Sequence, residues 1–372
     1  MEGLQIYNIS KWFFARVLSM PAIFMPYKTR IWYIRGLSAV IHAPFVLFGK
    51  LGRYLLSSLH VKPAMQKISP AKEPFDSGNV GANEHAQQSI AILFSGGTDS
   101  LCVAAISAQQ HQEVHLLTFY EYATQNSPSP EKNIASLKLK FPQTNFKHSM
   151  FSVDGLVRYF WYENYIKNLK KHGLLTLATC GFSSLSWHTR TILYCLEHNI
   201  TRVADGLTRE LMHFPGHMDD VVEQFRELYK KFGIIYENPV RNWPTPPDQQ
   251  FIDKVIVNNH GGDFLLGDGV IQTRKTTGHY LFSIGLLPNV NVKGSSLDFK
   301  MQHDCYPFAL YNILAFWGFL SFEPYEIYCH KMANLMADKI SCATKLIAEY
   351  KRKKENSPLS VLIGPYPKKI QA

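Results

Sequence analysis

The sequence predicts an α/β fold in which a parallel sheet carries helices on both faces. Two observations lead to this prediction. Five apolar residues, Ile90 to Phe94, run directly into the glycine-rich segment SGGTDS at residues 95–100, and a helix-like stretch follows at once. From there to residue 232, short apolar runs alternate with longer segments of helical character. Strands that alternate with helices of this length form parallel sheets whose two faces are both covered.

The elements of this alternation are expected in a fixed order. Strands are expected over residues 89–94, 113–120, 146–152, 174–180 and 202–205. Helices are expected over residues 100–110, 130–140, 154–171, 184–198 and 217–232. Beyond Pro239 the alternation weakens, and aromatic stretches at 306–320 and 326–350 predict a mainly helical C-terminal region. The expected organisation is a basic, aromatic, helical N-terminal arm (1–67), a linker (68–88), an α/β domain (89–240) and a C-terminal cap that binds substrate (241–372).

The segment between the first strand and the first helix has the features of an anion-binding loop. Gly96 and Gly97 allow backbone conformations closed to other residues and let amide N–H groups approach an anion closely. The helix N-terminus that follows adds partial positive charge. Hydroxyl groups and one carboxylate complete the loop, on Ser95, Thr98, Ser100 and Asp99. The alternative is an ordinary turn with an Asp or Ser helix cap.

Several segments resemble the PP-loop ATP pyrophosphatase superfamily and, within it, the 7-cyano-7-deazaguanine synthases. SGGTDS after a buried strand is similar to the PP-loop, and the kinase-type loop GxxxxGK[ST] is excluded because no Lys follows the second glycine. FYEY at residues 119–122 is similar to the FDYGQ segment of the synthases. SWHTRT at 186–191 stands where they carry GRNT, ADG at 204–206 follows a short strand, and FPGHMD at 214–219 is similar to their aromatic-Pro-Asp stretch.

This resemblance implies an ATP-dependent adenylating enzyme that uses Mg²⁺ and cleaves ATP between the α and β phosphates. A carboxylate, amide or carbonyl oxygen of an unidentified small-molecule or peptide acceptor would attack the α-phosphorus. An amine, ammonia or sulfur nucleophile would then displace AMP. The chain departs from the synthases in having no CxxC motif for their structural zinc, and its late cysteines, at 305, 329 and 342, stand too far apart for a convincing site.

Ligands of open parallel sheets bind beyond the carboxyl ends of the strands, and this rule sorts the candidate residues. The residues expected to hold ATP are Ser95, Gly96, Gly97, Thr98, Asp99, Ser100, Phe119, Tyr120, Asp205 and Gly206. Asp99 is also the expected ligand of Mg²⁺. For Asp205, an Asx turn is the alternative to a role in binding metal or substrate.

The catalytic candidates are Asp99, Arg190 and Cys180. Arg190 lies in a segment expected to open a helix beside the site, where its fork of donors suits phosphate or a carboxylate. An ion pair on the helix is the alternative role. Cys180 is expected to end a strand at the same edge, where it would act as a nucleophile or persulfide carrier. Packing is the alternative, and it is the usual role of a cysteine at a strand end.

The net charge of +10 is concentrated in the N-terminal arm. Residues 1–67 contain nine Lys or Arg and one acid, Glu2, whereas the rest of the chain contains 30 bases and 28 acids. This split argues against nucleic acid as a partner, because a tRNA-modifying enzyme is expected to be basic on or beside its catalytic domain. The longest uncharged run of the arm, residues 36–49, is too short to span a membrane. A membrane-surface segment, a packed extension and a transit peptide remain as alternatives for the arm.

Three functions are therefore weighed. The first is the adenylating enzyme, the second is a non-catalytic nucleotide-binding adaptor that docks at a membrane or partner protein, and the third is a tRNA thiolase. Unpaired cysteine spacing and the lack of an evident signal peptide favour a cytoplasmic setting. Attachment of the arm to a membrane would place the protein peripherally on its inner face.

Overall fold

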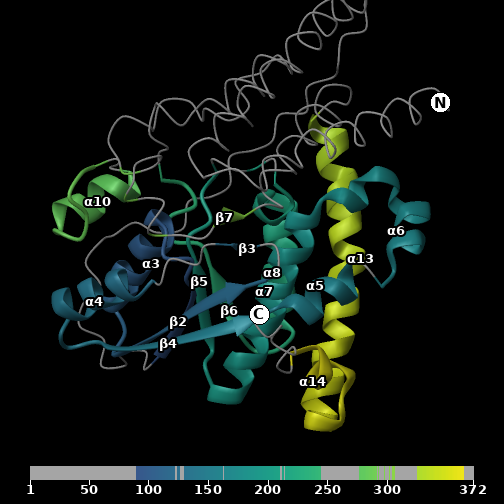
Figure 1. Ribbon diagram of the computed structural model, residues 1–372, viewed down its shortest axis with the longest axis horizontal. Helices are drawn as coiled ribbons and strands as arrows, with labels where there is room; N and C mark the ends of the chain where they lie inside the picture. Colours follow the sequence, from purple (N-terminus) through teal and green to yellow (C-terminus); the bar gives the residue numbers. More distant parts are fainter. Residues whose placement is uncertain are drawn as a thin grey trace, which may run out of the picture. The chain divides into compact units, whose positions relative to one another are not determined.

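The computed structural model describes residues 89–121, 124–125, 130–161, 163–209, 212, 214–243, 276–290, 292, 297, 301, 304–305 and 325–363. These residues all belong to one of the two compact units of the chain, which comprises Gln87–Ala315 and Glu323–Ala372. At their centre is a five-stranded sheet with helices on both faces (Figure 1). The predicted α/β class is confirmed.

The central sheet is parallel throughout and has the strand order β4-β2-β1-β5-β6. Its strands are β1 (Ser89–Leu93), β2 (Glu113–Tyr120), β4 (Asn145–Ser152), β5 (Arg202–Asp205) and β6 (Ile235–Glu237). Ala91 of β1 pairs with His115 of β2 on one side and with Val203 of β5 on the other. Because β1 is central and covered on both faces, its sequence is almost unbrokenly apolar. A separate antiparallel pair joins β3 (Thr124–Gln125) to β7 (Asp304–Cys305).

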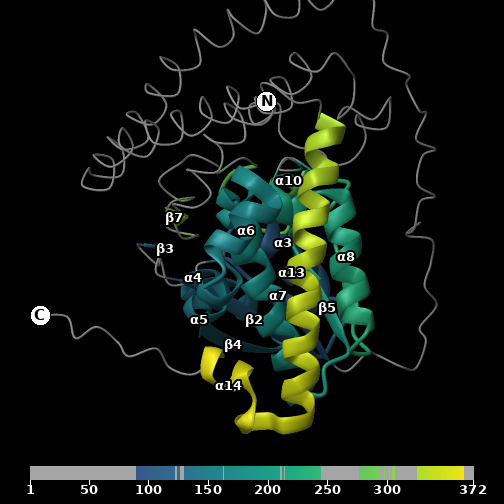
Figure 2. The ribbon, with the colours of Figure 1, turned by 90° about the vertical axis from the view of Figure 1, so that its right-hand side faces the viewer.

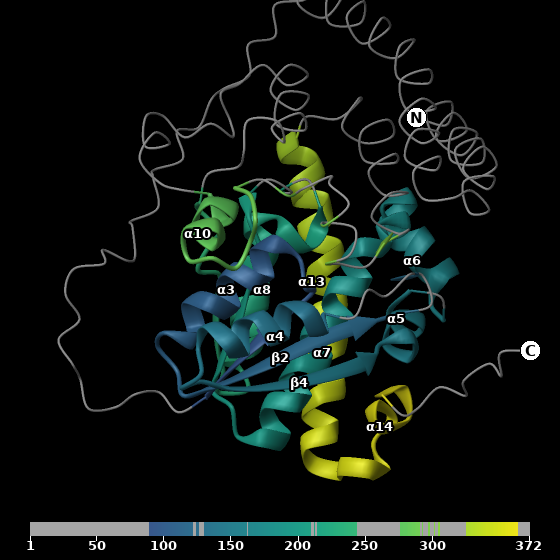
Figure 3. The ribbon, with the colours of Figure 1, turned by 60° about the vertical axis from the view of Figure 1, so that its left-hand side comes forward.

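Helices cover the sheet on its two faces. On one face lie α3 (Thr98–Ala108), α4 (Glu131–Lys140) and α10 (Thr277–Ser283) (Figure 3). On the other lie α5 (Asp154–Phe160), α7 (Thr179–His198) and α8 (Asp219–Lys230), with α13 (Tyr325–Lys353) packed against α7 and α8 (Figure 2). The remaining described helices are α6 (Tyr165–His172), α14 (Pro358–Ile363), η1 (Gly173–Leu177), η3 (Pro215–His217) and η6 (Lys354–Asn356).

The core on the α3 face draws on residues from distant parts of the chain. Ile92 of β1 and Leu101 of α3 belong to one buried cluster with Leu281 of α10 and with Met301. Part of the predicted C-terminal region therefore packs on the helix that begins at the SGGTDS segment.

One predicted strand is wrong. Residues 174–180 form η1 and the start of α7, and the fifth strand of the sheet is β6. A short apolar run cannot be assigned to a strand rather than to a buried helical turn by periodicity alone, and Leu175 and Leu177 are buried here without pairing in a sheet. The predicted helix over 154–171 is divided into α5 and α6, and the helix predicted over 184–198 begins earlier, at Thr179.

Several predictions lie outside the described residues. These are the N-terminal arm (1–67), the linker (68–88) and the helical stretch at 306–320. Among the residues that are described, no helix is long and apolar enough to cross a membrane. The described part of 241–372 consists mainly of helix, in α10, α13 and α14.

Candidate functional site

The loop after β1 turns at Gly96 before it enters α3. Gly96 has a φ of +85°, in the left-handed region that favours glycine. A Cβ at this position would also overlap the carbonyl oxygen of Met301. The side-chain amide of Asn133 also holds the turn, because its Nδ2 donates to the Gly96 carbonyl at 2.8 Å. The backbone path of the loop is therefore set by both conformation and space.

The N-cap residue of α3 has no side chain. It is Gly97, which makes no side-chain cap hydrogen bond among the described residues. The Ser95 hydroxyl accepts from the Gly97 N–H at 3.2 Å and lies 3.1 Å from the Ser100 hydroxyl, which donates to the Gly97 carbonyl at 3.0 Å. The first N–H groups of a helix have no acceptor within the helix, and they attract anions together with the helix dipole. The N-cap residue is thus a glycine and not the Asp or Ser of the helix-cap alternative.

Thr98 contributes a buried hydroxyl to the same turn. Only 6% of the residue is exposed, and its Oγ1 has no hydrogen-bond partner among the described residues. Leaving a buried polar group unsatisfied costs about 1–3 kcal/mol, so native proteins seldom contain one without a reason. A phosphate oxygen at the start of α3 is the kind of acceptor that suits such a donor.

Asp99 is held by a residue from the C-terminal region. It is the second residue of α3 and is half-buried. Oγ1 of Thr277, the first residue of α10, donates to Asp99 Oδ1 at 2.6 Å. One carboxylate combined with substrate phosphates is a common environment for Mg²⁺, so the donor set at the loop fits this ion. Elsewhere in the described part of the chain, no three His, Cys, Asp or Glu side chains are grouped in a way that would hold a metal.

Gly206 brings the end of β5 into close contact with the start of α3. A Cβ on Gly206 would stand 2.6 Å from the backbone nitrogen of Ser100 and 2.7 Å from the carbonyl carbon of Asp99. Only a glycine permits this approach. The structure therefore brings the predicted residues after β1 and β5 together at the carboxyl edge of the sheet.

Asp205, the neighbour of Gly206, is enclosed by donors of the protein. Its Oδ1 accepts from Asn238 Nδ2 at 2.7 Å and from the Leu207 N–H at 3.1 Å, and its Oδ2 accepts from the Tyr236 hydroxyl. Burial raises the pKa of Asp205, and these three donors oppose the rise. The bond to Leu207 is that of an Asx turn, so the described contacts of Asp205 fix the framework at the end of β5.

The end of β2 places three residues in different settings. Phe119 is buried and stacks on Phe151, whereas Tyr120 is 40% exposed. Glu121 is buried, and the Ser183 hydroxyl lies 2.8 and 3.0 Å from its two carboxylate oxygens. Burial raises the pKa of Glu121 to about 7, although the Ser183 hydroxyl opposes the rise. Glu121 belongs to the FYEY segment but was given no role of its own, and the signal for it was an acidic residue directly after a strand.

Arg190 and Cys180 both lie in α7, and both expectations about their position are wrong. Cys180 is the second residue of this helix and does not end a strand, so the reason for placing it at the site is lost. Arg190 lies well inside the helix, with its guanidinium carbon 4.1 Å from the ring centroid of Phe151 and Nη1 3.6 Å from Glu197 Oε2. These contacts match its alternative role as an ion-pair residue, although Nη1 is buried and has no hydrogen-bond partner among the described residues.

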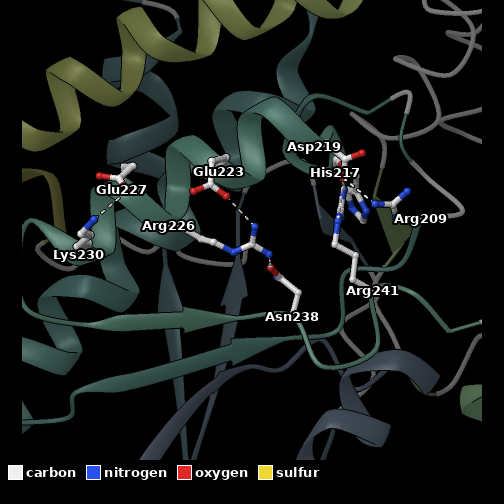
Figure 4. A network of polar contacts seen from close by, with 9 residues as sticks. All are labelled: Arg209, His217, Asp219, Glu223, Arg226, Glu227, Lys230, Asn238 and Arg241. Carbon is white, nitrogen blue, oxygen red and sulfur yellow. Dashed lines mark hydrogen bonds and ion pairs between the residues drawn. The ribbon is translucent and has the colours of Figure 1, made fainter. Parts of the chain in front are cut away.

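A polar network ties the segment after β6 to the start of α8 (Figure 4). Arg241, with 7% of its side chain exposed, donates to Asp219 Oδ1 from Nη2 at 2.6 Å and from Nε at 3.2 Å. It also donates to the carbonyl of His217 at 2.8 Å. Nη2 of Arg209, which follows β5, lies 3.6 Å from Asp219 Oδ1. This network was not predicted from the sequence, because the three-residue strand β6 was not predicted.

Comparison with known proteins does not identify a family for this chain. No family model matches the chain, and no curated protein is similar to it. Among solved structures, the chain is similar to one described as a predicted subunit of tRNA methyltransferase from Methanocaldococcus jannaschii. The similarity has 20% sequence identity, covers 42% of this chain and 70% of that one, and has a TM-score of 0.28. A likeness at this level carries no functional argument, so the class of protein is the one that the fold defines: a parallel α/β protein with a glycine-rich loop between its central strand and α3.

Proposed function

We propose that the chain is an ATP-dependent adenylating enzyme of the PP-loop type. The observation that supports this most directly is the uncapped N-terminus of α3, where the Thr98 hydroxyl lacks a partner in the described part of the chain. This helix end follows the central strand β1, at the edge of the sheet where ligands of parallel α/β proteins bind. The order of segments that resemble the PP-loop family supports the same reading.

In this proposal the loop binds the phosphates of ATP. The N–H groups of the first turn of α3 and the hydroxyls of Ser95, Thr98 and Ser100 contact the β and γ phosphates. Asp99 holds Mg²⁺, which offsets the phosphate charge. Negative charge on pyrophosphate grows as it leaves, and donors fixed in advance stabilise that charge most effectively.

The reaction forms an adenylate and releases pyrophosphate. An oxygen of the acceptor bonds to the α-phosphorus while the bond from that phosphorus to the oxygen bridging the α and β phosphates breaks. An amine, ammonia or sulfur nucleophile then attacks the activated carbon, and AMP leaves with the bonding electron pair. Tyr120, exposed beyond β2, offers an aromatic surface for the adenine base or the acceptor.

The products of ATP cleavage test the proposal. The full chain is incubated with Mg²⁺, candidate carboxylate acceptors and ATP labelled at the α or the γ phosphate. AMP and pyrophosphate are expected, whereas ADP and phosphate would exclude this reaction class. Asp99→Asn should lower turnover at least about tenfold, the scale of one lost charged contact. Asp220→Asn is the matched control, because Asp220 is an exposed acid in the first turn of α8.

Two other outcomes would favour the alternatives. If the chain binds ATP but neither the wild type nor Asp99→Asn turns it over with any acceptor, a nucleotide-binding adaptor is the better description. If tRNA co-purifies with the chain and its binding falls steeply with salt, a tRNA thiolase is favoured.

A further inference from the structure

Helix α10 reaches across α3 from the C-terminal region and contacts both of its ends. At the start of α3, Thr277 donates to Asp99, although the two residues are 178 positions apart in the sequence. Beyond the end of α3, Gln109 Nε2 donates to the Tyr280 hydroxyl at 2.6 Å. Leu281 lies in the buried core that α3 shares with β1. The contact between the two helices is therefore an apolar one with a hydrogen bond at each end.

The Thr277 hydroxyl is presented by a well-fixed turn. Oγ1 of the preceding residue, Thr276, accepts from the His279 N–H at 3.2 Å and so caps α10. Thr276 Oγ1 also lies 2.8 Å from His279 Nδ1. Gly278 packs so closely on the Val290 carbonyl that a Cβ there would overlap it. Because neighbours on both sides are constrained, the direction of the Thr277 hydroxyl toward Asp99 is constrained as well.

A second contact joins the same segment of chain to the phosphate loop. The carbonyl of Met301 lies against Gly96 and occupies the space that a Cβ would need. Met301 thus contacts the loop near its start, at Gly96, and Thr277 contacts it near its end, at Asp99. Neither contact is needed to form the parallel sheet, but both define the position of the loop.

We infer that Thr277 is a positioning residue for the carboxylate of Asp99, and that Thr277 and Met301 together complete the nucleotide site. This inference rests on the proposed function, in which Asp99 holds Mg²⁺. The hydrogen bond from Thr277 to Oδ1 restricts rotation of the Asp99 carboxylate. The carboxylate would then bind Mg²⁺ without first having to change its orientation. Loss of the hydroxyl should therefore weaken the Mg²⁺-dependent part of nucleotide binding and leave the Mg²⁺-independent part unchanged.

The test measures binding of α,β-methylene-ATP to the full chain across a range of Mg²⁺ concentrations. Thr277→Val removes the hydroxyl at almost constant volume and should raise the Mg²⁺ concentration for half-maximal binding about tenfold, the scale of one hydrogen bond to a charged group. Thr277→Ser keeps the hydroxyl and should stay within about twofold of the wild type. Tyr280→Phe, which removes the other hydrogen bond between α10 and α3, should also leave the Mg²⁺ requirement unchanged.

The outcomes separate this inference from the proposed function. If the wild type binds no nucleotide with Mg²⁺, the proposed function fails. If the wild type binds but Thr277→Val has the same Mg²⁺ requirement, only the role of Thr277 is overturned. An equal effect of Tyr280→Phe would also overturn it, because general loosening of α10 would then explain the result. Should the valine variant not fold, Thr277→Ala removes the same hydroxyl and serves in its place.

Discussion

The edge of the sheet has two polar regions that differ in how their donors are used. After β1, the start of α3 has no side-chain cap, and the Thr98 hydroxyl has no partner among the described residues. After β5 and β6, Asp205 accepts three hydrogen bonds from the protein, and Arg241 is anchored on Asp219 and on the His217 carbonyl. The first region combines a glycine N-cap with an unpartnered hydroxyl, whereas the second uses most of its polar groups to hold loops in place, although Nη1 of Arg241 is also buried without a partner among the described residues.

Under the proposed function, this difference separates a binding region from a framework region within one edge of the sheet. Polar residues after neighbouring strands look equivalent in the sequence, and the segments after β1 and β5 were both expected to hold ATP. Gly206 is the link between them, because its lack of a side chain lets the end of β5 lie against the backbone of Asp99 and Ser100. Substitutions in the two regions should therefore act on different properties, nucleotide affinity in one and the free energy of unfolding in the other.

The largest effect is expected for Gly96→Ala. Alanine is disfavoured at a φ of +85° by about 1–2 kcal/mol, and its Cβ would displace either the loop or Met301. A shift of the donors by about 1 Å can cost about 100-fold, so affinity for ATP with Mg²⁺ should fall at least that far. Calorimetric titration of the full chain measures this loss. Gly233→Ala, at a φ of +76° in open space, is the control for backbone strain alone and should keep its affinity.

Arg241→Met should act on stability. The substitution removes a buried cation from the half-exposed Asp219 and from the His217 carbonyl, and the loss of hydrogen bonds made by a charged group costs about 1–3 kcal/mol. Unfolding in urea measures this cost, with Lys230→Met as the exposed control on the same side of the domain. Affinity for ATP should remain within about twofold of the wild type, because Arg241 has no described contact with the loop at residues 95–100. A loss of affinity without a loss of stability would show that Arg241 binds ligand.

Glu121→Gln should change how stability depends on pH. The folded-state pKa of about 7 lies above the ordinary value of 4.5, so between these values the folded chain keeps a proton that the unfolded chain releases. This contribution is present at low pH and is lost as the pH rises toward 7, by up to about 1.4 kcal/mol per pH unit. Glutamine stays neutral and should flatten the slope between pH 5 and pH 7 in urea unfolding. Identical slopes in both proteins would contradict the raised pKa.

Arg190→Gln should have the smallest effect. Arg190 contacts Phe151 and Glu197, and contacts of this kind contribute up to about 1 kcal/mol each. ATP turnover should stay within about twofold of the wild type in the product assay. A drop comparable to that of Asp99→Asn would restore Arg190 as a catalytic candidate.

The sequence reveals the loop but not what surrounds it. The apolar run of β1, the paired glycines and the start of α3 are adjacent in the chain, so local rules were enough to place them. β6 has three residues and was missed, and with it the network of Arg241. The contact of Thr277 with Asp99 spans 178 positions and depends on how α10 packs, which no local pattern encodes. The burial that perturbs Glu121 likewise arises only when α7 brings Ser183 against the end of β2.

The most direct test of an open binding region is Thr98→Val, studied for affinity and stability together. Valine keeps the volume of threonine but removes the buried hydroxyl that has no described partner. If that hydroxyl serves a phosphate, affinity for ATP with Mg²⁺ should fall about tenfold, while the free energy of unfolding without nucleotide stays equal or rises. Unchanged affinity, or a loss of stability without nucleotide, would show that Thr98 belongs to the framework. The start of α3 would then not be the phosphate site.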